Sequence, residues 1–331
     1  MQHLLAGLAV AGSFTLGVVS TPAAPHGTRV LTFDDPAIVE SSDLVVDAGR
    51  FVTTNDSGDT GQVFVVDRTG RTLGLTHWSD GPTDVEALAP AGPGQVWVGD
   101  IGDNQGRRSS ITVTRVPVGR GDRDVHAPAY RLAYPDGGTD AETLLCDPVT
   151  GRLYVASKNV FGGVLYAAPA ELSATSTNPL KPVGRVLPVA TDGAFFPDGR
   201  HVIVRDYTSA VVYAWPSLQP VGSVDLPAQR QGEGIAVAAD GSVYVSSEGL
   251  RSPVLRVTLP PDIRQAVSAD APPADSPVGS PSASSSPGSA DPSASDPSEV
   301  EPAQRDVRPW LFGGLLGLAA VVVLLRALRP R

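Results

Sequence analysis

The chain repeats one phrase five times, and each copy begins and ends with a side chain able to do chemistry. A copy reads as an acidic or polar residue, an apolar run, a Gly-centred turn, a second apolar run and a further charged residue. The opening set is Ser42, Glu86, Glu142, Asp192 and Glu233. The closing set is Asp56, Asp100, Lys158, Asp206 and Glu248. A fold that gathers the five copies brings these groups to one place.

The opening set predicts a site for a divalent cation. Carboxylates close together raise one another's pKa unless a cation or an arginine lies among them. Calcium accepts about six to eight oxygen ligands in irregular geometry. We therefore predict a Ca²⁺ ion held by Glu86, Glu142, Asp192 and Glu233. The alternative is a structural role, because an acid at the start of a strand can also cap backbone N–H groups.

The closing set and one further basic residue form the predicted ligand-binding surface: Asp56, Asp100, Lys158, Arg205, Asp206 and Glu248. Its basic members either bind an anionic group or neutralise the acids around them. The loops that begin at Asn55 and Asp100 are rich in Asp, Asn and Gly, a composition that suits Asx turns or a wrapped cation.

Other chemistry has little support in the sequence. Cys146 is the single cysteine, so no intrachain disulfide forms, and its apolar neighbours indicate a small buried residue rather than a nucleophile. We find no His-x-x-x-His zinc pattern and no Gly-x-Ser-x-Gly nucleophile turn. The formal net charge is −10, without a Lys/Arg cluster between the apolar ends of the chain, so no nucleic-acid partner is expected.

The spacing and content of the repeats predict an all-β fold. Copies that recur roughly every 40 to 55 residues, each built of short strands, are typical of a β-propeller. We predict five blades of four strands, with six as the alternative because the second and third repeats are long.

The last copy lacks an outer strand, while an unpaired strand, 28–33, precedes the first copy. We predict that this strand closes the ring, which removes exposed sheet edges. The five Gly-centred turns then lie on one face, and the opening and closing sets lie on the other, around the mouth of the central channel.

The ends of the chain predict a cell-surface protein. Residues 1–23 read as a secretory signal with cleavage after Ala23. After the propeller, 28–260, the Pro/Ser-rich segment 265–308 is expected to be a disordered stalk. The apolar segment 310–328 spans about 28 Å as a helix, enough for a bilayer core. The trailing arginines favour a cytoplasmic tail, 329–331.

One segment carries a resemblance to known propellers. Gly232–Gly249 (GEGIAVAADGSVYVSSEG) resembles the phrase of NHL, gluconolactonase-like and phytase-like-esterase propellers, and segments 54–59 and 98–104 are similar to secreted propellers of actinobacteria. The gluconolactonase-like resemblance implies one divalent cation held at the channel mouth by an opening Glu, a position that Glu86, Glu142 and Glu233 match. The phytase-like resemblance implies ester or phosphoester hydrolysis.

Two functions follow as hypotheses. The first is a membrane-anchored extracellular propeller, monomeric, that binds an unidentified extracellular ligand or surface protein or serves as a scaffold, with a cation at its mouth. The second is a metal-dependent extracellular hydrolase of the phytase-like-esterase or lactonase type. In it the cation acts as Lewis acid, and Glu86, Glu142 or Glu233 acts as general base.

Overall fold

The computed structural model describes residues 27–56, 60–79 and 81–269. All of them belong to one compact unit within residues 1–274. Both partners of every strand pairing described below lie within this unit, and we infer that it folds on its own.

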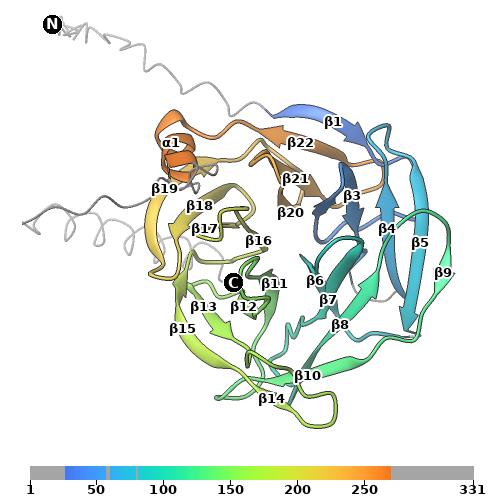
Figure 1. Ribbon diagram of the computed structural model, residues 1–331, viewed down its shortest axis with the longest axis vertical. Helices are drawn as coiled ribbons and strands as arrows, with labels where there is room; N and C mark the ends of the chain where they lie inside the picture. Colours follow the sequence, from blue (N-terminus) through green and yellow to red (C-terminus); the bar gives the residue numbers. More distant parts are fainter. Residues whose placement is uncertain (1–26, 57–59, 80, 270–331) are drawn as a thin grey trace, which may run out of the picture. The chain divides into compact units, whose positions relative to one another are not determined.

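The described residues form a five-bladed β-propeller (Figure 1). Blade 1 consists of β2 (Val45–Asp47), β3 (Arg50–Thr53), β4 (Gly61–Val66) and β5 (Thr72–Ser79). Blade 2 consists of β6 (Val85–Pro90), β7 (Gln95–Asp100), β8 (Ile111–Pro117) and β10 (Ala129–Ala133). Blade 3 consists of β11 (Ala141–Cys146), β12 (Leu153–Ser157), β13 (Gly163–Ala167) and β15 (Lys181–Val186).

Blade 4 consists of β16 (Asp192–Phe195), β17 (His201–Arg205), β18 (Ser209–Ala214) and β19 (Gln219–Asp225). Blade 5 consists of β20 (Gly232–Val237), β21 (Val243–Ser247), β22 (Pro253–Val257) and the N-terminal β1 (Thr28–Thr32). Strand β1 pairs antiparallel with β22, Thr28 lying opposite Arg256. The predicted closure of the ring is therefore confirmed.

The innermost strand of each blade contacts the innermost strands of the two neighbouring blades, so β2, β6, β11, β16 and β20 surround the channel. Each is joined to the next strand by a hairpin with a glycine of positive φ, such as Gly151 (φ 70°) and Gly241 (φ 77°). Only glycine adopts this conformation without steric cost. Buried Val and Leu side chains fill the space between blades, as Val45, Val52 and Leu88 do between blades 1 and 2.

Two blades carry a fifth strand that the sequence did not predict. The short strand β9 (Arg123–Asp124) leaves blade 2 and pairs parallel with the outer strand of blade 1, β5. In the same way β14 (Asn178–Pro179) leaves blade 3 and pairs parallel with β10 of blade 2. The second and third repeats are long, which was the reason for the six-blade alternative. Their extra residues instead cover the outer edges of two neighbouring blades.

The helix α1 (Pro261–Ala269) follows β22 and packs on blade 4. Ile263 is buried among the core residues of blades 4 and 5, and Val267 packs beside it. A side chain at Gly222 would lie 2.8 Å from Ile263, so this glycine makes room for the helix. The predicted stalk began at residue 265, but residues 265–269 belong to α1 because its apolar face is covered by β19.

Four predicted segments lie outside the described residues: the signal peptide 1–23, the remainder of the stalk, the membrane helix 310–328 and the tail 329–331. Within the described ranges, no helix is long and apolar enough to cross a membrane.

Candidate functional site at the channel mouth

Three glutamates of the opening set sit in β-bulges. The register between the first two strands shifts at Glu86 in blade 2, at Glu142 in blade 3 and at Glu233–Gly234 in blade 5. A bulge inserts one extra residue and changes the direction of its side chain. All three glutamates are nonetheless buried, which brings their carboxyl groups into an environment that disfavours charge.

Glu86 is the centre of an acidic cluster. One carboxylate oxygen from each of Asp56, Asp84 and Glu86 lies within 4.8 Å of the other two. Ser42, the opening residue of blade 1, donates from Oγ to Glu86 Oε2 over 3.1 Å. Burial, followed by the negative charges of Glu142 and Asp56, raises the pKa of Glu86 to about 10. The Glu86 carboxyl is therefore neutral at pH 7 unless a cation joins the cluster.

Gly102 allows this cluster to form. A Cβ atom at Gly102 would lie 2.4 Å from Asp84 Oδ2 and 2.9 Å from Glu86 Cγ. Any other residue would push the two acids apart, so the cluster requires a glycine at this position after β7.

Glu142 and Lys158 form an ion pair at the mouth, between Oε1 and Nζ. The Lys158 ammonium also lies 5.2 Å from the ring centre of Tyr207. The second oxygen, Glu142 Oε2, is buried and has no hydrogen-bond partner among the described residues. Burial raises the pKa of Glu142 to about 8, and the charge of Lys158 limits the rise.

Glu233 completes the group of mouth glutamates. Burial raises its pKa to about 7, and Lys158 again opposes the shift. Glu248, of the closing set, is less buried, and its pKa is raised by burial and then by the charge of Asp56. The pKa is raised most at Glu86, where the neighbouring charges are negative, and less at Glu142 and Glu233, where Lys158 opposes the rise.

The structure places Asp192 apart from these glutamates. It is fully buried in the channel, where its carboxyl is hydrogen-bonded to that of Asp43. Burial raises the pKa of both aspartates well above the usual value, and for Asp192 the charge of Asp43 adds to the effect. Sequence reasoning missed Asp43, because it aligned the preceding residue, Ser42, with the opening acids. An acid beside the opening position was the available signal.

Arg205 is fully buried below the mouth and donates hydrogen bonds to backbone carbonyls, including Gly234 O at 2.9 Å and Asp206 O at 3.0 Å. Burial lowers its pKa to about 10, so it remains a cation at neutral pH. Its donors bind backbone carbonyls of blades 4 and 5 rather than a surface ligand.

Two other residues of the predicted ligand-binding set accept hydrogen bonds from backbone N–H groups of nearby loops. Asp100 accepts the backbone N–H groups of Thr83 and Asp84 and pairs with Arg108 over 2.8 Å. Asp206 accepts from the turn that follows it, with Ser209 N at 2.7 Å. The mouth therefore gathers Asp56, Lys158 and Glu248 from this set, while Asp100, Arg205 and Asp206 make internal contacts.

Exposed apolar side chains lie on the loops of the same face. Phe161 is 90% exposed and Val160 is 70% exposed in the loop after Lys158. Leu250 is exposed in the β21–β22 loop, which is joined to the segment before β2 by a hydrogen bond from Gly249 N to Val39 O. We call Val39, Val160, Phe161 and Leu250 the apolar rim. Exposed apolar side chains on one face make that face a candidate binding surface.

The fold and the mouth place this chain in the class of β-propellers with a charged channel mouth. No protein-family model and no curated protein matches it. The resemblance to NHL, gluconolactonase-like and phytase-like-esterase propellers stays a prediction.

Proposed function

We propose that this chain is an extracellular binding module, monomeric and anchored in the cell membrane, that engages a ligand or surface partner with its mouth face. The observation that carries this proposal is the presence of an acidic mouth and the apolar rim on one face of the propeller. Anchoring and secretion rest on the sequence of residues 1–23 and 310–328.

A calcium ion at the mouth is part of this proposal. A cation about 2.5 Å from three oxygens needs them within about 5 Å of one another, and Asp56, Asp84 and Glu86 meet that condition. Two features fit a cation: the close approach of the Gly102 backbone lets Asp84 and Glu86 lie beside each other, and Glu142, whose charge acts on Glu86, has a buried Oε2 without a hydrogen-bond partner among the described residues. The ion would balance the charge that burial disfavours.

Calorimetric titration of the compact unit with Ca²⁺ tests the cation. We expect one ion per chain, and about one proton released at pH 7 because Glu86 must ionise to bind it. Proton release is read from the difference between two buffers of unlike ionisation enthalpy. Glu86→Gln is expected to abolish binding, and Glu171→Gln, an exposed acid outside the mouth, to leave it unchanged. A wild-type chain that binds no Ca²⁺ contradicts the assignment.

Capture of surface proteins by wild type, Phe161→Ser and the Val149→Ser control tests the partner. Phe161 belongs to the apolar rim, whereas Val149 is 74% exposed in the β11–β12 hairpin of the opposite face. We expect Phe161→Ser to lose a partner that both other chains retain. Equal capture by all three contradicts a role for the rim.

A hydrolase is the second candidate, and the raised pKa values of two mouth glutamates favour it. A general base acts best when its pKa lies near the working pH, and the pKa values of Glu142 and Glu233 are raised to about 8 and about 7. The double variant Glu86→Ala, Glu142→Ala is expected to abolish turnover of lactones or phosphoesters. Unchanged turnover would remove the glutamates from the mechanism.

A further inference from the structure

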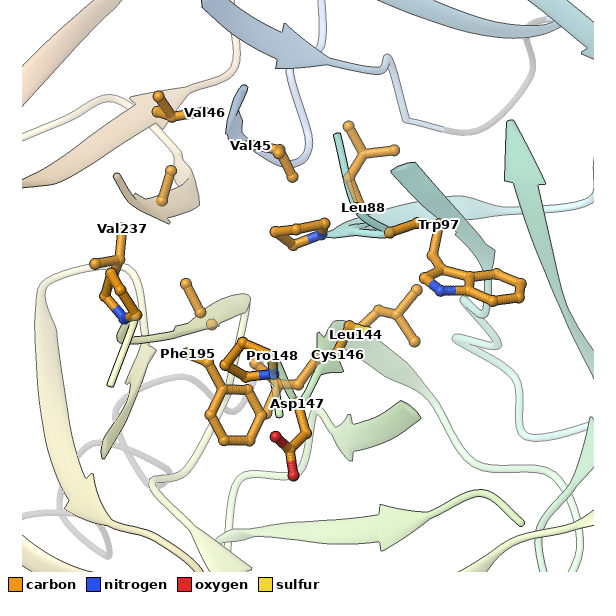
Figure 2. A pocket seen from close by; sticks show the side chains of 18 of the residues that line it. Val45, Val46, Leu88, Trp97, Leu144, Cys146, Asp147, Pro148, Phe195 and Val237 are labelled. Atoms are coloured by element: carbon orange, nitrogen blue, oxygen red, sulfur yellow. The ribbon is translucent and has the colours of Figure 1, made fainter. Parts of the chain in front are cut away.

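The opposite end of the channel, on the hairpin face, holds a second cavity. Its volume is about 480 Å³, and its wall comes from all five innermost strands. Figure 2 shows Val45, Leu88, Leu144, Phe195 and Val237 around one open space. Cavities of this size are typical of small-molecule sites.

The wall is apolar, and its charged groups are already engaged. Among its described residues, only Arg115 and Asp147 carry a charge. Arg115 donates from Nη2 to Ala91 O over 2.6 Å, and its guanidinium lies 6.0 Å from the ring centre of Trp97. Asp147 accepts from Val149 N and from Thr150 Oγ1, each at 2.8 Å. The two side chains carry opposite charges and are held at the hairpins of blades 2 and 3, so the wall has no net formal charge to attract a charged ligand.

The cavity is separate from the acidic mouth. Leu44, Leu88 and Gly193 belong to its wall, and their backbone N–H groups are held by Asp43 and Asp192. The hydrogen-bonded aspartates thus close the inner end of the cavity. Because the wall is built from five blades that pack against one another, it exists without a ligand and costs little to organise on binding.

We propose that this hairpin-face cavity binds an uncharged, largely apolar small molecule. An apolar wall of this extent gains free energy when a ligand replaces the water it holds. A side chain of a partner protein is the competing occupant, but five converging walls that meet at a closed inner end fit a compact molecule better than an extended chain.

N-phenyl-1-naphthylamine, an uncharged fluorescent probe, tests this with residues 24–274. We expect saturable binding of one probe per chain. Its sulfonated counterpart, 8-anilinonaphthalene-1-sulfonate, has the same rings with one negative charge, and we expect it to bind at least about tenfold more weakly, because a buried charge needs a partner. Absence of saturable binding by the uncharged probe overturns the proposal, and tighter binding of the sulfonate overturns the assignment of an uncharged ligand.

Two modifications locate the site. Val237→Trp fills the cavity from β20, and Val183→Trp, at an exposed position of the outer strand β15, is the matched control. Cys146, the single cysteine, also lines the cavity, and burial raises the pKa of its thiol to about 11. Prolonged alkylation with N-ethylmaleimide, followed by mass spectrometry until each chain carries one adduct, fills the space without changing the sequence. Cys146→Ser treated in the same way is its control.

We expect the uncharged probe to bind at least about tenfold more weakly to Val237→Trp and to the alkylated wild type, since a filled pocket leaves no room for it. Both controls should retain binding. Equal probe affinity in the filled and control chains would place the probe elsewhere and overturn the proposal. Calcium binding at the mouth should be unchanged in the alkylated chain. A negative result for the cavity therefore leaves the proposal for the mouth intact, and the reverse also holds.

Discussion

The carboxyl groups of Asp43 and Asp192 are hydrogen-bonded to each other inside the channel, although blades 1 and 4 are not neighbours in the ring. Each carboxyl also accepts two backbone N–H groups, one from the next residue and one from an adjacent blade. The pair therefore connects four of the five blades. Its hydrogen bond requires a proton on one carboxyl, which agrees with the raised pKa of both.

A double-mutant cycle measures this connection. Asn has one acceptor oxygen where Asp has two, so Asp43→Asn leaves a buried backbone N–H unsatisfied. We expect Asp43→Asn and Asp192→Asn each to lower the free energy of unfolding by about 1–3 kcal/mol. In the double variant we expect a coupling of about 0.5–3 kcal/mol, measured by urea unfolding. Strictly additive losses would show that the two carboxyl groups do not interact.

The mouth glutamates predict a stability that falls as pH rises, measured in the presence of a chelator. Their pKa values in the folded state are raised above an unfolded value of about 4.3. Between the two values the folded state holds more protons, so its stability is greatest at low pH and is lost with rising pH. The loss extends to about pH 7 for Glu233, pH 8 for Glu142 and pH 10 for Glu86.

The variant Glu86→Gln isolates the largest of these shifts. It removes the ionisable group, so its thermal midpoint should fall less than that of wild type between about pH 5 and pH 9. Glu171→Gln, the exposed control, should follow wild type. Parallel curves for Glu86→Gln and wild type would mean that Glu86 has an ordinary pKa.

Substitution of Arg205 is expected to lower the stability of the fold strongly and not to act on ligand binding. Its guanidinium is fully buried and donates to the carbonyls of Gly234 and Asp206. Arg205→Met leaves those carbonyls without donors, and we expect a cost of about 3–5 kcal/mol in urea unfolding. Arg131→Met, on an exposed position of β10, should change stability by less than about 0.5 kcal/mol. A mild effect at Arg205 would favour the ligand-binding role predicted from the sequence.

The blades and their order were predictable from local signals. Apolar runs separated by Gly-centred turns repeat along the chain, and the missing outer strand of the last copy matched the unpaired strand before the first. Strands β9 and β14 were not predictable in this way. Each has two residues and forms only because an outer strand of the neighbouring blade offers free backbone groups.

The mouth was predicted as a region, and its contacts were not. The repeat places Glu86, Glu142 and Glu233 at equivalent positions, but the bulges that direct their side chains depend on pairing with the second strand. Asp192 looks equivalent in sequence, yet it lies in regular register opposite Arg205 and turns into the channel. Such differences depend on tertiary packing, which periodicity does not encode.

The helix α1 supplies the last prediction, because its sequence resembles the start of a polar linker while its packing belongs to the core. Ile263 is 1% exposed and contacts Gly222 on β19. Ile263→Ala should lower the free energy of unfolding by about 2–5 kcal/mol, whereas Arg264→Ala, its exposed neighbour, should have little effect. Gly222→Ala should cost about 1–3 kcal/mol, since its new methyl group meets Ile263. In the double variant Gly222→Ala, Ile263→Ala the smaller side chain makes room for that methyl group, so the combined loss should be less than the sum. Equal stability of wild type, both single variants at Gly222 and Ile263, and the double variant would show that the propeller ends before the helix.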